Sequence, residues 1–299
     1  MSSEKKAAFV AVVGRPSVGK STLVNLLCGA KVAIVSVVPQ TTRNAIRGIV
    51  NRPEGQLVFV DTPGRHASTR KLNKKLIEVS DRSITDAELV LYVLDASRAP
   101  GEEEVAIAAR LAVCADKTVA AVNKMDAQGA DYEGTVAFLN SHLPGIPASR
   151  CLKVSALKHQ GAEAIVSCLF DMAGEGPALY PEEYYTDQTL HFRIAEIIRE
   201  KAINRLRQEL PHSLYVEVAD AELRDEGKRL WVRAFLITER ESQKGMVVGK
   251  GGEMIKTIRL AAQQELNRLF DWKVDLDLRV KSSPDWRHND AVLRRLIAP

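Results

Sequence analysis

Long apolar runs and paired cysteines are both missing from this sequence. No hydrophobic stretch approaches the ~20 residues that a helix needs to cross a bilayer. Only Met1 to Lys6 precede the first apolar run, which is too little for a signal or transit peptide. The four cysteines form no C-x-x-C pair and have no metal-like spacing with histidine. We therefore expect a cytoplasmic protein with free thiols and no disulfide framework.

Charge is nearly balanced, so the composition by itself favours no particular partner. The 299 residues carry a net charge of +4, with 45% hydrophobic and 27% charged residues, as in ordinary globular chains of about two domains. From Pro181 onward, 21 Lys and Arg accompany 20 Asp and Glu, so any basic binding surface must be local. The spacing of serine, histidine and carboxylates predicts no catalytic triad or carboxylate pair, and there is no internal repeat.

Apolar runs alternate with amphipathic stretches over the first part of the chain. Four of the runs end in a polar residue, namely Asp61, Asp95, Asn123 and Ser155. Runs of this kind predict strands of a mostly parallel sheet, and ligands of open α/β sheets bind beyond the carboxyl ends of such strands. We therefore predict a doubly wound α/β domain over residues 1–175, with one site along that edge.

A change in composition divides the chain. A stretch rich in Gly, Pro and Glu, without periodicity, predicts a linker over residues 176–189. Beyond it, a helix, two strands, a glycine-rich turn, a second helix and a last strand follow one another. This order predicts a smaller α+β domain over residues 190–299.

A complete phosphate-binding loop, GRPSVGKS, lies between an apolar run and a helix-like segment. Its glycines let main-chain N–H groups turn inward around phosphates, and the following helix adds its partial positive charge. Lys20 is expected to bridge the β- and γ-phosphates, and the Ser21 hydroxyl to bind Mg²⁺. The predicted nucleotide-binding residues of this loop are Gly14, Arg15, Pro16, Ser17, Val18, Gly19, Lys20, Ser21 and Thr22.

An N-K-x-D motif at residues 123–126 indicates which base is bound. The Asp126 carboxylate can accept from the N1–H and 2-amino groups of guanine together, whereas adenine would leave it unpaired. A main-chain N–H near the next strand end, that of Ala156, is expected to bind the guanine O6. GTP is therefore favoured, and an ATP-using kinase is disfavoured. The predicted base-binding residues are Asn123, Lys124, Asp126, Ser155, Ala156 and Leu157.

Two further segments complete the predicted nucleotide site. Asp61 would hold Mg²⁺ through a water, and the Gly64 N–H would sense the γ-phosphate, with Thr62 and Pro63 between them. Thr42, favoured over Thr41, would bring its hydroxyl to Mg²⁺ from a switch segment. No Gln follows Gly64, so slow intrinsic turnover is expected. The predicted catalytic residues are Lys20, Thr42, Asp61 and Gly64, and the predicted metal ligands are Ser21, Thr42 and Asp61.

A Gly-x-x-Gly turn at the start of the second C-terminal helix indicates nucleic-acid binding. Such a turn lets the main chain lie flat against a nucleic acid backbone and clamp about four nucleotides. Alone, the motif is more often a helix cap with a solvated face. The order of helices and strands around it, together with the family resemblance described below, favours the RNA-binding interpretation. The cations nearby form a local basic strip. The predicted RNA-binding residues are Arg240, Lys244, Gly249, Lys250, Gly251, Gly252, Lys256 and Arg259.

Together these motifs resemble the Era family of bacterial GTPases over about residues 7–290. The resemblance includes the P-Q-T-T-R segment at 39–43 and the segment from Glu239 to Lys256 around the glycine turn. It implies a Ras-like P-loop GTPase domain with a mostly parallel sheet, a type II KH domain after it, and the use of GTP, GDP and Mg²⁺. Ser17 stands where the family commonly has Asn, a K⁺ ligand in related GTPases, so a requirement for K⁺ does not follow.

The resemblance also implies partners. It predicts binding near the 3′ end of small-subunit (16S) ribosomal RNA, assistance in maturation of 30S ribosomal particles and, in some members, peripheral association with the inner face of the cell membrane. We expect a monomer in which GTP orders the Thr41-Thr42 segment and so gates the hold of the KH domain on RNA. Two alternatives stay open: an RNA chaperone or assembly scaffold in which nucleotide is structural, and another GTPase of the same superfamily.

Overall fold

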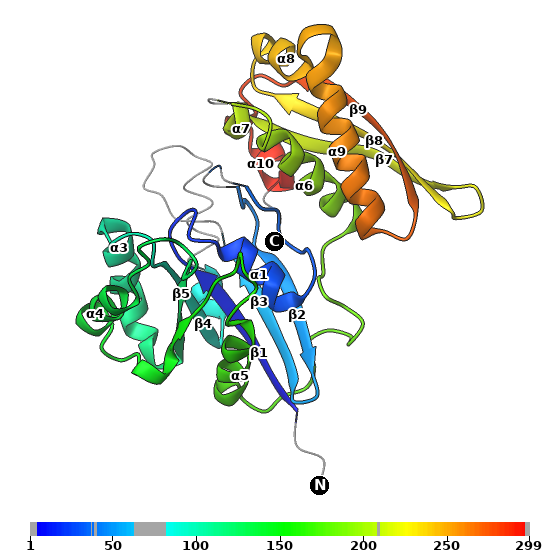
Figure 1. The fold of residues 1–299 in the computed structure, drawn as a ribbon. Coiled ribbons are helices and arrows are strands. Elements are labelled where there is room, and N and C mark those ends of the chain that lie inside the picture. Colours follow the sequence, from blue (N-terminus) through cyan, green and yellow to red (C-terminus); the bar gives the residue numbers. More distant parts are fainter. Residues whose placement is uncertain (1–4, 37, 39–40, 63–81, 208–209, 297–299) are drawn as a thin grey trace. The chain divides into compact units, whose positions relative to one another are not determined.

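The computed structural model describes residues 5–36, 38, 41–62, 82–207 and 210–296 (Figure 1). Its contacts divide the chain into two compact units. The first contains the described residues up to Ala33 and from Thr42 to Asp187, and the second contains Ile34–Thr41 and Gln188–Leu296. The second unit thus includes a short segment whose chain neighbours on both sides belong to the first.

A six-stranded sheet in the order β2-β3-β1-β4-β5-β6 is the frame of the first unit. Neighbouring strands are parallel except for β2, which runs antiparallel to β3. Three strands, β3, β4 and β5, are buried along their whole length, as is typical of strands covered on both faces. The strands are β1 (Lys6–Val13), β2 (Ile46–Arg52), β3 (Gly55–Asp61), β4 (Leu89–Asp95), β5 (Thr118–Asn123) and β6 (Cys151–Lys153).

Helices cover this sheet and bury its apolar side chains. Tyr92 of β4 packs in one cluster with Leu111 and Leu139, and all three are almost fully buried. The helices are α1 (Lys20–Cys28), α3 (Glu102–Leu111), α4 (Tyr132–His142) and α5 (Ala162–Met172), with short 3₁₀ turns η1 (Ala112–Lys117) and η2 (Ala148–Arg150). The predicted α/β class is confirmed. The prediction omitted β2 and α4, whose sequences alternate too weakly between apolar and polar residues to indicate an element.

The second unit has a three-stranded sheet in the order β7-β8-β9. Strand β7 is antiparallel to β8, and β9 is parallel to β8. Its strands are β7 (Leu214–Arg224), β8 (Arg229–Thr238) and β9 (Lys273–Ser282). Its helices are α6 (Leu190–Ile203), α7 (Leu210–Ser213), α8 (Glu241–Val248), α9 (Glu253–Leu269) and α10 (Asp290–Leu296), with 3₁₀ turns η3 (Lys250–Gly252) and η4 (Trp286–His288).

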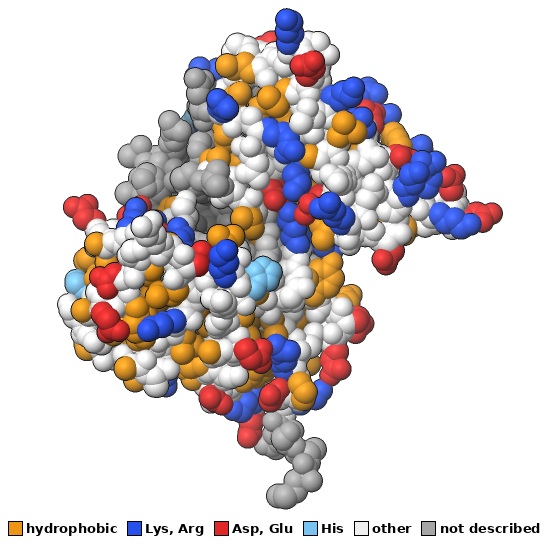
Figure 2. Space-filling view, in the orientation of Figure 1, with side chains coloured by type: hydrophobic (Ala, Val, Ile, Leu, Met, Phe, Trp, Pro, Cys, Tyr) orange, Lys and Arg blue, Asp and Glu red, His pale blue; other side chains and the backbone are white. Residues whose placement is uncertain are grey.

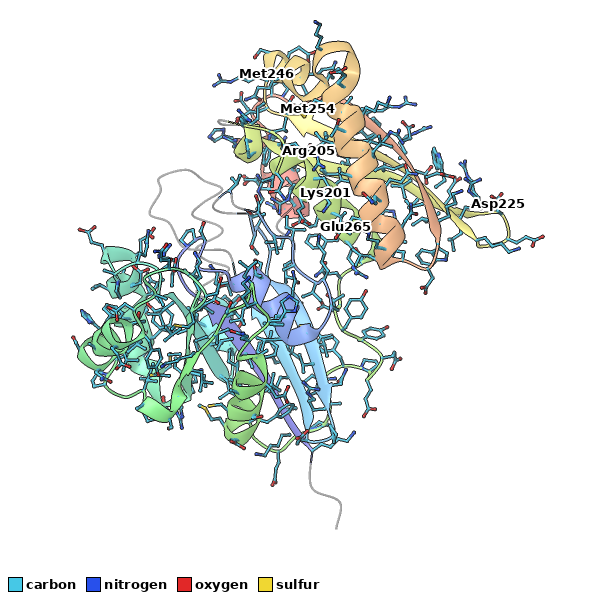
Figure 3. All side chains as sticks on the ribbon, in the orientation of Figure 1. Lys201, Arg205, Asp225, Met246, Met254 and Glu265 are labelled. Atoms are coloured by element: carbon cyan, nitrogen blue, oxygen red, sulfur yellow. The ribbon has the colours of Figure 1, made fainter. Side chains whose placement is uncertain are left out.

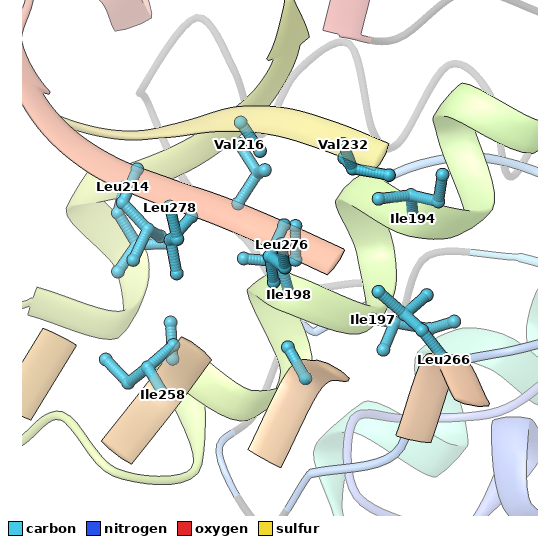
Figure 4. Close-up of a cluster of buried hydrophobic side chains, with 14 of the residues drawn as sticks. Ile194, Ile197, Ile198, Leu214, Val216, Val232, Ile258, Leu266, Leu276 and Leu278 are labelled. Carbon is cyan, nitrogen blue, oxygen red and sulfur yellow. The ribbon is translucent and has the colours of Figure 1, made fainter. Parts of the chain in front are cut away.

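The core of the second unit lies between one face of this sheet and helices α6 and α9 (Figure 4). Alternate residues of β8 are buried, as expected of a strand that is covered on one face. They meet Ile198 of α6 and the Ile258 and Leu266 side chains of α9. The helix and strand order that the sequence predicted for this half is therefore present.

The stretch predicted as a linker, 176–189, belongs largely to the first unit. The Ile49 N–H of the edge strand β2 donates to the Tyr185 carbonyl at 3.0 Å, and the Thr186 hydroxyl donates to the Arg47 carbonyl at 2.8 Å. Arg47 also pairs with Asp187 at 2.9 Å. Composition indicates an irregular chain, but it cannot reveal that the chain lies along a sheet edge. By contacts the division falls after Asp187, so the limits 1–175, 176–189 and 190–299 stay predictions.

Candidate nucleotide site and RNA-binding turn

The phosphate loop between β1 and α1 has a main chain that requires glycine. Gly19 has φ +98°, and a Cβ there would lie 2.5 Å from Asn123 Nδ2. The Lys20 ammonium folds back over the loop and donates to the carbonyls of Gly14 at 2.9 Å and Arg15 at 3.0 Å. Burial lowers the pKa of Lys20 to about 8, although the nearby Asp61 carboxylate opposes that shift. Of the remaining predicted loop residues, Val18 is buried, Pro16 and Thr22 are half-buried and Ser17 is exposed.

Three oxygen-bearing side chains meet at the start of α1. The Ser21 hydroxyl donates to Asp61 Oδ2 at 2.6 Å and lies 3.1 Å from the Thr42 hydroxyl. Asp61 Oδ1 is buried and has no hydrogen-bond partner, and burial raises the pKa of this carboxyl group to about 6. The charge of Lys20 and the Ser21 and Thr42 hydroxyls act against that rise.

These oxygens fit Mg²⁺. Magnesium prefers hard oxygen ligands and is commonly held by one or two carboxylates together with substrate phosphates. The unpartnered Oδ1 of Asp61 leaves a buried acceptor that a cation or its water would satisfy. Thr41 is placed elsewhere, because its hydroxyl donates to the Val38 carbonyl at 2.7 Å. Among the described residues, no group of three or more His, Cys, Asp or Glu could hold a metal.

The remaining predicted residues of this edge differ in how far the structure describes them. Thr62 is buried, and its hydroxyl donates to the Val12 carbonyl at 2.8 Å, which fixes the end of β3 against β1. Pro63 and Gly64, predicted beside the γ-phosphate, lie outside the described residues.

Asn123 connects the phosphate loop to the base-binding loops. Its Nδ2 donates to the Val18 carbonyl at 2.8 Å, and its Oδ1 accepts from the Ala156 N–H at 3.0 Å. Because the Ala156 N–H already donates to Asn123, its predicted hydrogen bond to guanine O6 would be a bifurcated bond that both acceptors share. Asp126 Oδ1 accepts from the Ser155 hydroxyl at 2.5 Å, which orients the carboxylate, while the Leu157 side chain is 72% exposed.

A buried ionic network that the sequence analysis did not predict links the same two loops. The Arg15 guanidinium donates to Asp95 Oδ2 at 2.7 Å and to Glu104 of α3, and Lys124 Nζ donates to the same Asp95 oxygen at 2.8 Å. Burial opposes ionisation of Asp95, but hydrogen bonds from Lys124 and Ser97 outweigh it and lower its pKa. Arg15 thus turns its side chain to Asp95 and Glu104. The sequence feature that could have predicted this network is Asp95, a polar residue at the end of β4 that pairs in register with Asn123 of β5.

In the second unit, the Gly-x-x-Gly turn joins α8 to α9. Gly249, Gly251 and Gly252 have φ of +74°, +60° and +80°. A Cβ on Gly249 would lie 2.7 Å from that of Met254, whereas a Cβ on Gly251 would meet nothing within 4 Å. Met246 and Met254 flank the turn (Figure 3), the first exposed and the second half-buried.

The predicted basic strip surrounds this turn. Among the residues that the structure describes, the exposed side chains of Arg240, Lys250 and Lys256 have no acid within ion-pair distance. Lys244 instead pairs with Glu241 at 3.1 Å, and Arg259 donates to Gln263 at 3.1 Å. Basic side chains are visible around the end of the unit where α8 meets α9 (Figure 2). The turn therefore presents an open main chain beside three available cations.

Comparison with protein-family models gives two matches. The model described as a 50S ribosome-binding GTPase matches residues 9–124, and the model described as a KH domain matches residues 209–287. In the described part of the chain, no helix combines the length and the apolar character that spanning a membrane requires.

Similar proteins and structures cover nearly the whole chain. GTPase Era of Treponema denticola is 50% identical over 97% of this chain and 99% of its own, and GTPase Era of Borreliella afzelii is 42% identical over 98% and 99%. A crystal structure of Era in complex with MgGDPNP and nucleotides 1506–1542 of 16S ribosomal RNA has a TM-score of 0.90 and 32% identity over 98% and 99% of the two chains. A structure of an Aquifex aeolicus Era variant bound to GDP.AlF4⁻ has a TM-score of 0.91 at the same identity and coverage.

These similarities extend through both units and agree with the motifs of each. They identify a Ras-like GTPase unit followed by a KH domain, and the protein is a GTPase that uses GTP, GDP and Mg²⁺. The chain belongs to the Era family of GTPases.

Proposed function

We propose that this chain is a GTP-dependent switch that binds 16S ribosomal RNA near its 3′ end and assists maturation of the 30S subunit. The observation that carries the proposal is the open Gly249–Gly252 turn with exposed Lys250 and Lys256 beside it, in a chain that also has a nucleotide site. The Era structure with MgGDPNP and 16S nucleotides supports the choice of RNA, because that complex contains both ligands.

The nucleotide site performs phosphoryl transfer to water by positioning and charge. Lys20 is placed to neutralise charge on the β- and γ-phosphates of a bound nucleotide. The oxygens of Ser21, Thr42 and Asp61 would hold Mg²⁺, which would supply positive charge against the charge that develops on the phosphates. Asp126 selects guanine. Because no glutamine orients the attacking water after residue 64, intrinsic hydrolysis is slow, as a switch requires.

A pair of glycine variants tests the RNA-binding turn. Gly251→Asp places a carboxylate in open space at a conformation that aspartate tolerates, so the fold is retained while RNA phosphates are repelled. We expect binding of a 16S 3′-end oligonucleotide to weaken at least about tenfold, the effect of one lost charge-assisted contact or more. Fluorescence anisotropy with the full chain in the presence of Mg²⁺ and GDPNP measures it.

The matched variant at this turn is Gly249→Ala, whose Cβ would clash with Met254. It should weaken RNA binding and also lower the melting temperature, because the α8–α9 connection has to shift. Lys158→Ala, on an exposed loop of the first unit, should change neither. If Gly251→Asp binds RNA as tightly as wild type, the turn is not the RNA-binding site. If the protein binds unrelated RNA as tightly as the 16S 3′ end, the proposed choice of RNA is wrong.

Location and assembly are further parts of the proposal. We propose a cytoplasmic monomer that associates peripherally with the inner face of the membrane through basic surface residues. The free thiols in the described residues agree with a reducing compartment. Flotation with vesicles of 30% anionic lipid, run at about 0.1 and 0.5 M salt, tests the membrane part, since electrostatic binding weakens with salt. Absence of flotation at low salt would exclude it.

A further inference from the structure

Helix α6 and the residue after it contact described residues of the segment Ile34–Thr41 at two places within the second unit. Asn204, directly after α6, accepts from the Ser36 hydroxyl at 2.6 Å and donates to the Val35 carbonyl at 3.2 Å. Further along the segment, Arg199 Nη2 donates to the Thr41 carbonyl at 2.6 Å. Val35, Ser36 and Thr41 are therefore tied to α6 and to the residue that directly follows it.

The Arg199 side chain is fixed before it reaches Thr41. The side chain is only 3% exposed, and its guanidinium forms two hydrogen bonds with Glu196, Nε to Oε1 at 2.6 Å and Nη2 to Oε2 at 2.5 Å. A bidentate pair of this kind neutralises the buried charge and sets the plane of the guanidinium. The bond to Thr41 is thus made by a rigid donor, and lysine could not reproduce the whole set.

The Thr41 carbonyl belongs to the same peptide plane as the Thr42 N–H, because the peptide bond is planar. A donor that fixes this oxygen limits the rotation of the plane and so the direction in which Thr42 leaves it. Thr42 lies with its hydroxyl 3.1 Å from Ser21 Oγ, which in turn bonds Asp61. A single peptide bond therefore joins Thr41, whose carbonyl oxygen Arg199 holds, to Thr42, whose hydroxyl lies at the candidate Mg²⁺ site.

We propose that Arg199 is a positioning residue for the nucleotide site: it stabilises the arrangement of the Thr41–Thr42 peptide in which the Thr42 hydroxyl faces Ser21 and Asp61. The inference rests on one part of the proposed function, the role of Thr42 as a Mg²⁺ ligand in the GTP state. By linkage, bound Mg·GTP strengthens the contact between Arg199 and Thr41, and loss of that contact weakens GTP relative to GDP.

The test compares two dissociation constants of the full chain, without RNA. Fluorescent Mg·GDPNP and Mg·GDP are titrated into wild type and into Arg199→Gln. We expect Arg199→Gln to reduce the preference for GDPNP over GDP about tenfold, the effect of one hydrogen bond from a charged donor. Arg205→Gln is the matched control, because Arg205 lies just beyond α6 and donates instead to the Lys201 carbonyl (Figure 3). It should leave the preference unchanged.

A double-variant cycle separates positioning from general stability. In a Thr42→Ala background, Arg199→Gln should have no further effect on the GDPNP preference, because the hydroxyl that it positions is gone. Asn204→Ala removes the second tie at an exposed residue and should lower the preference in the same direction, even where Arg199→Gln folds poorly.

Three outcomes would overturn the inference. If Thr42→Ala leaves the GDPNP preference unchanged, the proposed Mg²⁺ role of Thr42 fails and the inference fails with it. If Thr42→Ala lowers the preference but neither Arg199→Gln nor Asn204→Ala does, the inference alone is wrong. If Arg199→Gln weakens both nucleotides equally, or adds fully to Thr42→Ala, Arg199 is a structural residue only.

Discussion

Asparagine in place of Asp126 should lower the affinity for GDP about 1,000-fold, and xanthosine diphosphate should recover most of that loss. Both guanine hydrogen bonds lose their charged acceptor, and a hydrogen bond to a charged group is worth roughly 1.5–3 kcal/mol. Xanthine carries a carbonyl where guanine has its 2-amino group, so an asparagine amide can donate to it. Titration of GDP and xanthosine diphosphate into wild type and variant gives the change in the dissociation constant of each nucleotide.

Ser155→Ala is the control for this change of base preference. The Ser155 hydroxyl orients Asp126 without replacing its charge, so its loss should weaken GDP by less than about tenfold and leave the preference for guanine over xanthine intact. Two results would show that Asp126 does not recognise the base. In one, Asp126→Asn lowers the affinity for GDP by less than tenfold. In the other, the variant binds xanthosine diphosphate no better than wild type does.

Lys20→Ala should reduce the rate of GTP hydrolysis by about 10²–10³-fold, the loss typical when a preorganised charge donor is removed from a transition state. The ammonium also closes the loop by bonding the carbonyls of Gly14 and Arg15, so nucleotide affinity should fall as well. Single-turnover hydrolysis at saturating GTP separates the rate from the affinity.

A second lysine provides the comparison for Lys20→Ala. Lys117 also donates to a main-chain carbonyl, that of Ala87, but it lies outside the nucleotide motifs. The Lys117→Ala variant should therefore hydrolyse GTP at the wild-type rate. The scaffold alternative predicts that small-subunit particles mature normally in cells carrying Lys20→Ala. Accumulation of immature particles in those cells would favour the switch.

The local parts of the nucleotide site could be predicted from the sequence because each is a short motif at a strand end. Gly14 to Ser21 follows β1, and Asn123 ends β5, so the parallel sheet brings them to one edge. The same reasoning applies to Ser21 and Asp61, whereas Thr42 is predicted from its place in the segment between the phosphate-loop helix and the strand that ends at Asp61. The Ser21 hydroxyl lies within hydrogen-bond distance of both the Thr42 hydroxyl and the Asp61 carboxylate.

Contacts between distant residues with no motif of their own could not be predicted. Asp95 and Glu104 look like an ordinary strand end and an ordinary helix start, and only the folded chain places the Arg15 guanidinium between them. The attachment of Thr41 to Arg199 is of the same kind, since 158 positions separate the two residues. Periodicity reports which face of an element is buried, but it does not report which partner a polar side chain selects.

The irregular stretch along β2 has a consequence for solubility. An edge strand exposes a row of unused N–H and C=O groups that can pair with another chain and start aggregation. In this protein the Tyr185 carbonyl occupies the N–H of Ile49, and Asn51 Nδ2 donates to the carbonyls of Glu182 and Tyr184. A GTPase fragment that stops before Pro181 would keep every nucleotide motif yet leave this edge open to self-association, whereas one that continues to Asp187 would carry its own cover.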